Sequence, residues 1–318
     1  MSAPTTTTKA TGTRTWRWGA VTGFPAGSPD PRRALEVVRR VDAAGADLVL
    51  LEPGPDGVDS HDTTSLAGFT SSLRTAAAGV VPGGAVDDVP PYQLARRTAS
   101  LDHLHRGRSG WWCTGTAGLP VGRAEEHAAV LRALWESWEP DAVVGDVAGG
   151  AYADHTKVHA VDHRGPHYAV RGPLNTVPSP QGRPLLVVSD DGERSVALAA
   201  RWADVLVLDG RSAATGSDTR ADTVARLRAG LVRAGRGPGD CLALVRVATT
   251  DPDAVEAVVR SCGADGFLVD VPAAAAAHEV EHRLTAATAD LVRVLSARGH
   301  LAPRPAEHGL RRRLLEEN

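Results

Sequence analysis

Apolar residues follow two alternating patterns along this chain of 318 residues. Short unbroken apolar runs are typical of strands buried on both faces, and longer segments with apolar residues every three or four positions are typical of amphipathic helices. The expected strands are 17–21, 47–51, 79–81, 109–114, 185–189, 204–208, 241–247 and 266–271. The expected helices are 31–44, 62–77, 94–104, 124–138, 194–202, 219–234, 251–262 and 276–298. Strands alternating with helices in this way predict an α/β fold, the TIM (β/α)8 barrel.

Local signals refine several of these elements. Asp30 before Pro31, and Asp251 before Pro252, are expected to cap the helices that begin there, because an Asp accepts free backbone N–H groups and Pro suits the first helical position. Trp111 and Trp112 are neighbours on one strand. One is therefore expected to face the barrel interior and the other the surrounding helices.

The chain divides into three parts. Residues 1–15 are Thr-rich and are expected to be disordered. Residues 16–299 form the barrel, including an excursion at 141–183 that interrupts the alternation; it is expected to be a lid or a subdomain, with a hairpin formed by 157–161 and 167–170. Residues 300–318 are expected to pack on the barrel as a C-terminal tail.

Composition narrows the class of partner and the compartment. A net charge of -3 argues against nucleic acid or an anionic membrane as the main partner. No apolar run approaches the roughly 20 residues of a membrane span, and the N-terminus lacks the apolar segment of a secretory signal. Cys113, Cys241 and Cys262 form neither a disulfide framework nor a metal motif, so a reducing, cytoplasmic setting is expected.

The chemistry of a barrel lies at the C-terminal ends of its strands, which we call the mouth. Arg246 is the main cation expected there. The carboxylates expected there are Glu52, Asp190, Asp191, Asp209 and Asp270. A pair of these carboxylates could serve as general acid and base, or each could simply cap a helix. Trp18 and Trp111, with Glu52 and Arg246, are candidates to line a substrate pocket.

Several long blocks of sequence resemble one family. They are PYQLARRTASLDHLHRGRSGWW, LRALWESWEPDAVV, AYADHTKVHAVDHRGPHYAVRGPLNTVPSPQGRPLLVV and GLRRRLLEE. These blocks resemble the nitrilotriacetate and dibenzothiophene-sulfone monooxygenases, relatives of pristinamycin IIA synthase in the bacterial luciferase superfamily. The resemblance covers most of the chain from about residue 16 onward.

The resemblance implies a luciferase-type barrel and an FMN-dependent monooxygenase. Reduced flavin from a separate flavin reductase, together with O2, would oxidise a small organic substrate, including one from secondary metabolism, and the protein would be a homodimer. By position in the family pattern, the flavin contacts would be Trp112, Thr114, Ser189, Asp190 and Gly192. No metal site is expected.

This sequence departs from the family pattern where the flavin would lie. Trp112 stands where relatives usually have an Asn that contacts the flavin. The segment Val188–Ser195 carries two aspartates and a glutamate where relatives have small residues around the flavin phosphate. Two like charges about 4 Å apart repel by roughly 4 kcal/mol at an effective dielectric near 20. The loop after the fourth strand is also short and lacks the Tyr that helps hold the phosphate.

Two alternatives to a flavin enzyme therefore stay open. The chain could be a cofactor-independent enzyme with a Trp-lined pocket, or a non-catalytic partner of a related barrel. His155, His159, His163 and His167 recur every four residues, but the surrounding Pro and Gly argue against the helix that a metal site would need. Cys113 is expected to be an inert core thiol.

Overall fold

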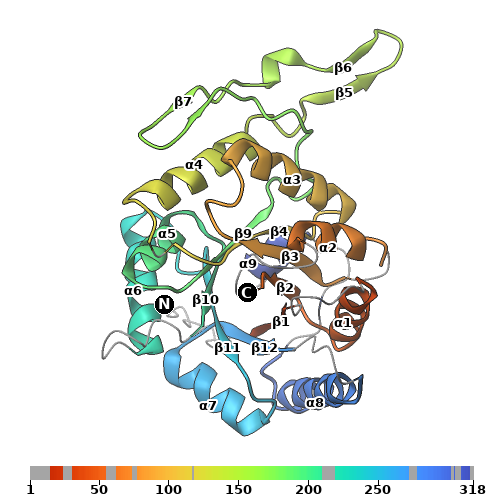
Figure 1. Cartoon of the computed structure of the whole chain (residues 1–318), viewed down its shortest axis with the longest axis vertical. Coiled ribbons are helices and arrows are strands. Elements are labelled where there is room, and N and C mark those ends of the chain that lie inside the picture. The colour runs from red at the N-terminus through yellow and green to blue at the C-terminus, as the bar shows by residue number, and fades with distance from the viewer. Residues whose placement is uncertain are drawn as a thin grey trace, which may run out of the picture.

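The computed structural model describes residues 15–23, 31–54, 62–73, 77–116, 118–209, 219–271, 278–301, 304 and 309–315. Its centre is a closed barrel of parallel strands with the neighbour order β1-β12-β11-β10-β9-β4-β3-β2 (Figure 1). These strands are β1 (Arg17–Gly23), β2 (Leu48–Glu52), β3 (Gly79–Gly84), β4 (Gly110–Cys113), β9 (Leu185–Ser189), β10 (Val205–Leu208), β11 (Leu242–Val247) and β12 (Gly266–Asp270). The barrel predicted from the sequence is confirmed.

Helices surround the barrel, one after each strand. They are α1 (Arg32–Ala43), α2 (Thr63–Thr70), α3 (Pro91–Leu104), α4 (Arg123–Trp135), α5 (Glu193–Trp202), α6 (Arg220–Arg233), α7 (Pro252–Cys262) and α8 (His278–Ala297). Asp251 caps α7 as predicted, its side chain accepting from Asp253 N. Asp30 lies outside the described residues, and Pro31 occupies the N-cap position of α1. Among the described residues, no helix has the length and apolarity to cross a membrane.

Two helices end earlier than their apolar patterns predict. α2 stops at Thr70 because the hydroxyls of Ser71 and Ser72 donate to the last helical carbonyls, Gly68 O and Phe69 O. Such short polar side chains compete with the helix for backbone partners. At the end of α4, the Ser137 hydroxyl donates to Leu134 O and accepts from Leu174 N, which draws the chain out of the helix.

Side chains alternate between the barrel interior and the layer under the helices. Trp112 is among the interior residues, whereas Trp111 belongs to the outer layer with the apolar faces of the helices, as predicted. β3 makes room for both with two glycines. A Cβ on Gly83 would lie 2.8 Å from Trp112 Cε3, and one on Gly84 would lie 2.3 Å from Trp111 Cη2. The two tryptophans therefore occupy space that β3 leaves empty on each of its faces.

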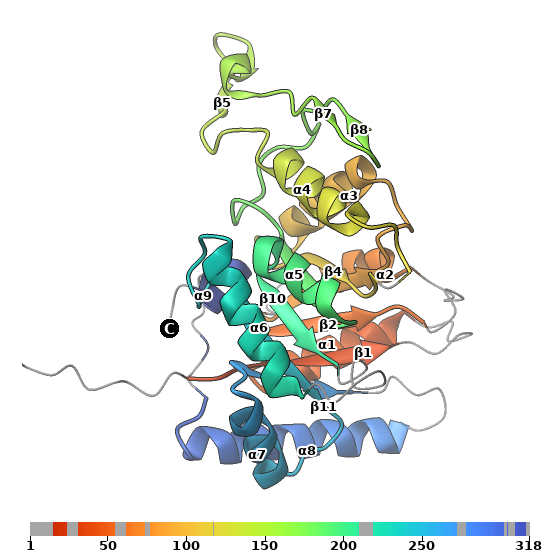
Figure 2. The ribbon, with the colours of Figure 1, turned by 90° about the vertical axis from the view of Figure 1, so that its left-hand side faces the viewer.

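A short C-terminal helix, α9 (Leu310–Leu315), closes the end of the barrel opposite the mouth (Figure 2). Leu310 and Leu314 are fully buried with the interior residues. Arg313 is also fully buried and donates to Ala77 O at 3.0 Å and Asp47 O at 2.8 Å, at the starts of the strands.

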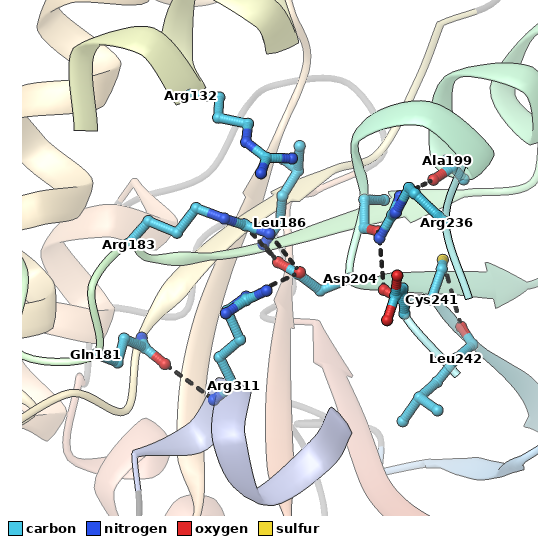
Figure 3. A network of polar contacts seen from close by, with 12 residues as sticks. Arg132, Gln181, Arg183, Leu186, Ala199, Asp204, Arg236, Cys241, Leu242 and Arg311 are labelled. Atoms are coloured by element: carbon cyan, nitrogen blue, oxygen red, sulfur yellow. Dashed lines mark hydrogen bonds and ion pairs between the residues drawn. The ribbon is translucent and has the colours of Figure 1, made fainter. Parts of the chain in front are cut away.

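The buried carboxylate of Asp204 joins α9 to the strands at this end of the barrel (Figure 3). It accepts from Arg183 at 2.7 and 2.8 Å, from Leu186 N at 2.9 Å and from Arg311 of α9 at 3.1 Å. Gln181 accepts from Arg311 N at 2.9 Å. A buried charge is stabilised only when it is paired and hydrogen-bonded in this way.

The excursion differs in detail from its prediction. It contains two small hairpins, β5 (Val143–Asp146) with β6 (Ala151–Ala153), and β7 (His163–Arg164) with β8 (Ala169–Val170). The first strand of the second hairpin is His163–Arg164 rather than the predicted 157–161. Lys157 instead ends a 3-10 turn, His155–Lys157, that Asp154 caps by accepting from Thr156 N. The excursion projects beyond α3 and α4, to the side of the barrel (Figure 1).

Candidate functional site at the barrel mouth

Arg246 lies at the mouth and is bonded to carboxylates from two other strands. Its guanidinium donates twice to Glu52, at 2.7 and 2.8 Å, and once to Asp270, at 2.5 Å. Asp209 lies 3.6 Å from the same guanidinium. Because β2, β11 and β12 contribute these groups, the ion pairs span one side of the mouth. The hydrogen bonds and charges of Glu52 and Asp270 outweigh burial and raise the pKa of Arg246.

The strand-end residues Glu52, Asp209, Arg246 and Asp270 are therefore brought together as the sequence predicts for a barrel mouth. Three carboxylates face one guanidinium, so this group carries a net negative charge when all are ionised. The side chains of Arg246 and Glu52 are only 16% and 20% exposed. A bidentate Arg–carboxylate pair is geometrically specific, so these side chains are held in fixed positions relative to one another.

Trp112 occupies the barrel interior beneath the mouth. It is 1% exposed, and its Nε1 donates to the Ser189 hydroxyl at 2.9 Å. Thr114 directly follows β4, and its methyl carbon would lie 2.9 Å from a Cβ placed on Gly83. The indole therefore fills the interior between β3 and β9, and the Ser189 hydroxyl is the acceptor for its N–H group.

The loop between β9 and α5 turns its acidic side chains onto neighbouring donors. Asp190 Oδ1 accepts from Gly192 N at 3.2 Å. The Asp191 carboxylate accepts from Thr116 N and, at 2.7 Å, from the Thr116 hydroxyl. Burial raises the pKa of Asp190, and the negative charges of Asp191 and Asp209 act in the same direction. The N-terminus of α5 is thus surrounded by the chain's own carboxylates.

Two of the proposed pocket residues lie elsewhere. Trp18 is 3% exposed, belongs to the outer layer and stacks on Phe267 with ring centroids 6.2 Å apart. It is the second residue of β1, near the end opposite the mouth. Trp111 is also in the outer layer and borders a cavity of about 10 Å³ beneath α4, together with Cys113 and His127. The structure thus places both tryptophans under the helices rather than in the barrel interior.

The structure also brings in two residues that were not among the candidates from the sequence. Thr116 anchors Asp191, and Gly83 provides the space for Trp112. The pair of glycines in β3 was a usable signal, because an interior strand carries adjacent glycines where large side chains face it. No local sequence pattern could indicate the hydrogen bond between Thr116 and Asp191, since 75 residues separate them.

The four histidines of the excursion do not converge. His159 contacts Glu139 at 2.7 Å, His163 contacts Glu126 at 2.8 Å, and His167 contacts Val121 O at 3.1 Å. Among the described residues, no group of three or more His, Cys, Asp or Glu side chains could hold a metal ion. His163 and His167 connect the excursion to α4 and its preceding loop.

Comparisons with known proteins define the class. Residues 114–312 match the family model for luciferase-like monooxygenases. This match covers the loops after β4, β9, β10, β11 and β12, and with the closed barrel it shows that the chain belongs to the luciferase-like monooxygenase family.

Individual relatives are consistent with this assignment. One of the two matching subunits of pristinamycin IIA synthase from Streptomyces pristinaespiralis is 40% identical over 174 residues, which is 54% of this chain and 60% of that protein. The second matching subunit of the same synthase is 31% identical over 174 residues, 48% of this chain and 36% of that protein. Nitrilotriacetate monooxygenase component A of Aminobacter aminovorans is 35% identical over 153 residues, 43% of this chain and 34% of that protein. The matched segments thus span less than two thirds of each relative.

Solved structures agree on the fold. The crystal structure of DmoA from Hyphomicrobium sulfonivorans superimposes with a TM-score of 0.77, covering 96% of this chain and 93% of that one at 18% identity. At this identity the similarity concerns the fold alone.

The residues at the mouth can be tested for their fit to FMN, the cofactor implied by the resemblance. A phosphate dianion would need free N–H donors or cations at the N-terminus of α5. Gly192 N already donates to Asp190, Asp191 N donates to the Ser195 hydroxyl at 2.9 Å, and Glu193 adds a further acid in the first turn. Arg194 donates to Leu119 O at 3.1 Å, and Arg226 partly offsets the charge around Asp190. The N–H donors at the N-terminus of α5 are already bonded and acidic side chains surround them, so this terminus does not fit a phosphate.

The isoalloxazine ring meets a second obstacle. The expected contact residue, Trp112, offers an indole N–H that Ser189 already accepts, and its ring fills the interior side of the mouth. Trp112, Ser189, Asp190 and Gly192 are close together, as the resemblance implied. Their polar groups are bonded to one another or to the adjacent backbone rather than directed toward a ligand.

Proposed function

We propose that this chain is part of a luciferase-like monooxygenase that oxidises a small organic molecule with O2 and reduced FMN supplied by a separate flavin reductase. The match of residues 114–312 to the luciferase-like monooxygenase family carries this proposal. It is supported by relatives named as monooxygenases of nitrilotriacetate, dibenzothiophene sulfone and dimethyl sulfide. The similarity to pristinamycin IIA synthase favours a natural-product substrate.

The chain would act as half of a dimer in a reducing, cytoplasmic setting. The relative that is 40% identical is named as one subunit of a synthase, and the chain also matches a second subunit of that synthase. The three cysteines are all buried free thiols, as expected for a reducing compartment. Both a homodimer and an assembly with a second, related chain are compatible with this proposal.

Oxygen-isotope incorporation tests the proposed function. The tagged chain is purified from its source cells with any luciferase-like chain bound to it, and is supplied with NADH, FMN, a flavin reductase and labelled O2. The substrate panel holds thioethers, sulfones, aminopolycarboxylates and extracts of the source cells. Label in an organic product, dependent on the chain, is the expected result; label that is equally abundant without the chain contradicts the proposal.

A further inference from the structure

We propose that the mouth of this barrel is closed to FMN by the chain's own side chains, and that the flavin of the proposed oxygenase is held by a second luciferase-like chain. This inference rests on the proposed function for the identity of the cofactor. A flavin would have to displace side chains in three parts of the mouth.

The first part is the interior side of the mouth. Trp112 is buried between β3 and β9, and Gly83 is the residue paired with it across the strands. The contact is tight, because even one added carbon on Gly83 would lie 2.8 Å from the indole. The indole cannot move toward β3 without meeting backbone: Leu51 O would lie 2.9 Å from the same added carbon. The hydrogen bond to Ser189 holds the ring on the other side.

The second part is the set of ion pairs around Arg246. A ring that entered beside β11 would have to separate Arg246 from Glu52 or Asp270, which accept three hydrogen bonds from it. Removing one partner from a mostly buried pair leaves the other charge uncompensated. A neutral ring edge does not replace a carboxylate as a partner for a guanidinium, so the chain favours its own ion pairs over a flavin.

The third part is the N-terminus of α5. Asp190 and Asp191 occupy backbone and hydroxyl donors on both sides of this terminus, Gly192 N and Thr116. A phosphate would therefore compete with two carboxylates that are covalently tethered next to their donors. It would also bring its two negative charges beside Asp190, Asp191 and Glu193.

The second chain has a defined chemistry. It would be a luciferase-like barrel whose mouth offers free N–H donors at the helix N-terminus after its fifth barrel strand and no bulky side chain on the interior side of its fourth. The similarity of this chain to two subunits of one synthase supports a pairing of two related barrels. In such a pair, this chain would contribute to assembly and to the shape of the complex rather than hold the cofactor.

Equilibrium titration with FMN, followed by quenching of flavin fluorescence, tests the inference on the purified chain. The wild-type chain is expected to show no saturation up to about 1 mM FMN. The triple variant Trp112→Asn, Asp190→Asn, Asp191→Asn opens the interior and neutralises the helix terminus, and is expected to bind at least tenfold more tightly than the wild type. Asp290→Asn, which removes an exposed carboxylate of α8, is the matched control and should not change binding.

The complex provides the second measurement and covers the case in which the triple variant does not fold. The wild-type chain bound to its luciferase-like partner is expected to hold one FMN per pair, and the partner alone is expected to bind FMN. Saturation of the isolated wild-type chain at micromolar FMN, or two FMN per pair, overturns the inference.

Different outcomes contradict the proposed function and the inference about the mouth. If the chain binds no FMN and its partner does, but no labelled oxygen reaches a product, the proposed function fails and the inference on the mouth stands. If the chain alone binds FMN and oxygenates a substrate, the function stands and the inference fails.

Discussion

Asp204 shows most clearly how one buried residue controls the stability of this barrel. Burial alone would raise the pKa of its carboxyl, but the charges and hydrogen bonds of Arg183, with Arg311, lower it below its ordinary value. A carboxyl group whose pKa is lower in the folded state stabilises the fold above its unfolded-state pKa. This contribution is lost as the pH falls through the folded-state value.

We therefore predict that Asp204→Asn lowers the free energy of unfolding by about 3 kcal/mol at neutral pH, because two arginines lose their common partner. The difference from the wild type should narrow as the pH falls below about 4, because the carboxyl is protonated first in the unfolded wild-type chain and only at a lower pH in the folded protein. Urea unfolding at a series of pH values measures both effects, with Asp290→Asn as an exposed control. An unchanged difference between neutral and acidic pH would argue against the charge as the cause.

The cysteines give a second prediction at the scale of residues. Burial raises the pKa of Cys113 and Cys241 to about 12, so almost no thiolate is present at neutral pH. Cys262 is also buried, and burial raises its pKa. All three thiols should resist a water-soluble disulfide reagent in the native protein and react promptly in denaturant. Fast labelling of Cys113 in the native state would instead indicate an open, reactive site.

Some residue placements could be predicted from the sequence and others could not. The opposite orientations of Trp111 and Trp112 follow from strand geometry alone. The outward orientation of Trp18 could not be predicted, because the sequence does not reveal which alternate set of β1 residues faces inward. That choice is set by close packing with β2: a Cβ on Gly19 would lie 2.5 Å from Leu48 O, so the interior at this level accepts only a glycine.

At the scale of elements, the contribution of α9 packing to the free energy of unfolding can be measured. A Cβ on Gly79 would lie 2.2 Å from Leu310 Cδ2. Gly79→Ala should therefore cost about 1–3 kcal/mol through overpacking, and Leu310→Ala about 2–5 kcal/mol through the cavity that it leaves.

The double variant Gly79→Ala, Leu310→Ala distinguishes direct contact from independent effects. Its cost should be smaller than the sum of the two single costs, because the added methyl enters space that the shortened side chain vacates. Thermal or urea unfolding of the four proteins completes the cycle. Simple additivity would mean that α9 does not pack against Gly79 in solution.

The barrel elements were predictable because their signals are strong and local. Unbroken apolar runs mark the strands, and Asp251 with Pro252 marks the start of α7. The excursion was less predictable because its strands contain only two to four residues and have no buried face to impose an apolar period. Its position is set instead by distant contacts such as that of His163 with Glu126.

At the scale of the whole molecule, Arg246 helps to hold the barrel closed at the mouth. It joins β11 to β2 and β12 through Glu52 and Asp270. Arg246→Met keeps the length of the side chain but leaves these carboxylates without their cation, and we predict a loss of about 2 kcal/mol of unfolding free energy after allowance for partial exposure. Arg260→Met, which disrupts an exposed pair on α7, should cost less than about 1 kcal/mol. Urea unfolding of both variants measures the difference, and equal costs would mean that the ion pairs at the mouth contribute no more than a surface pair.

The family and the fold could be inferred from the sequence because they depend on many positions at once. The state of the mouth depends on a few long-range contacts, such as Trp112 with Ser189 and Arg246 with Glu52, and the second of these joins residues 194 positions apart. The substitutions at Trp112, Asp190 and Asp191 were visible in the sequence. That Trp112 would bond to Ser189, and Asp190 and Asp191 to Gly192 N and Thr116, required the structure.

A crystal structure of the chain after soaking in FMN would show whether the mouth admits the flavin. We expect that Trp112 stays hydrogen-bonded to Ser189, that Arg246 stays between Glu52 and Asp270, and that the mouth contains no flavin density. A flavin ring in the mouth with its phosphate at the N-terminus of α5, and Trp112 displaced from the interior, would contradict it.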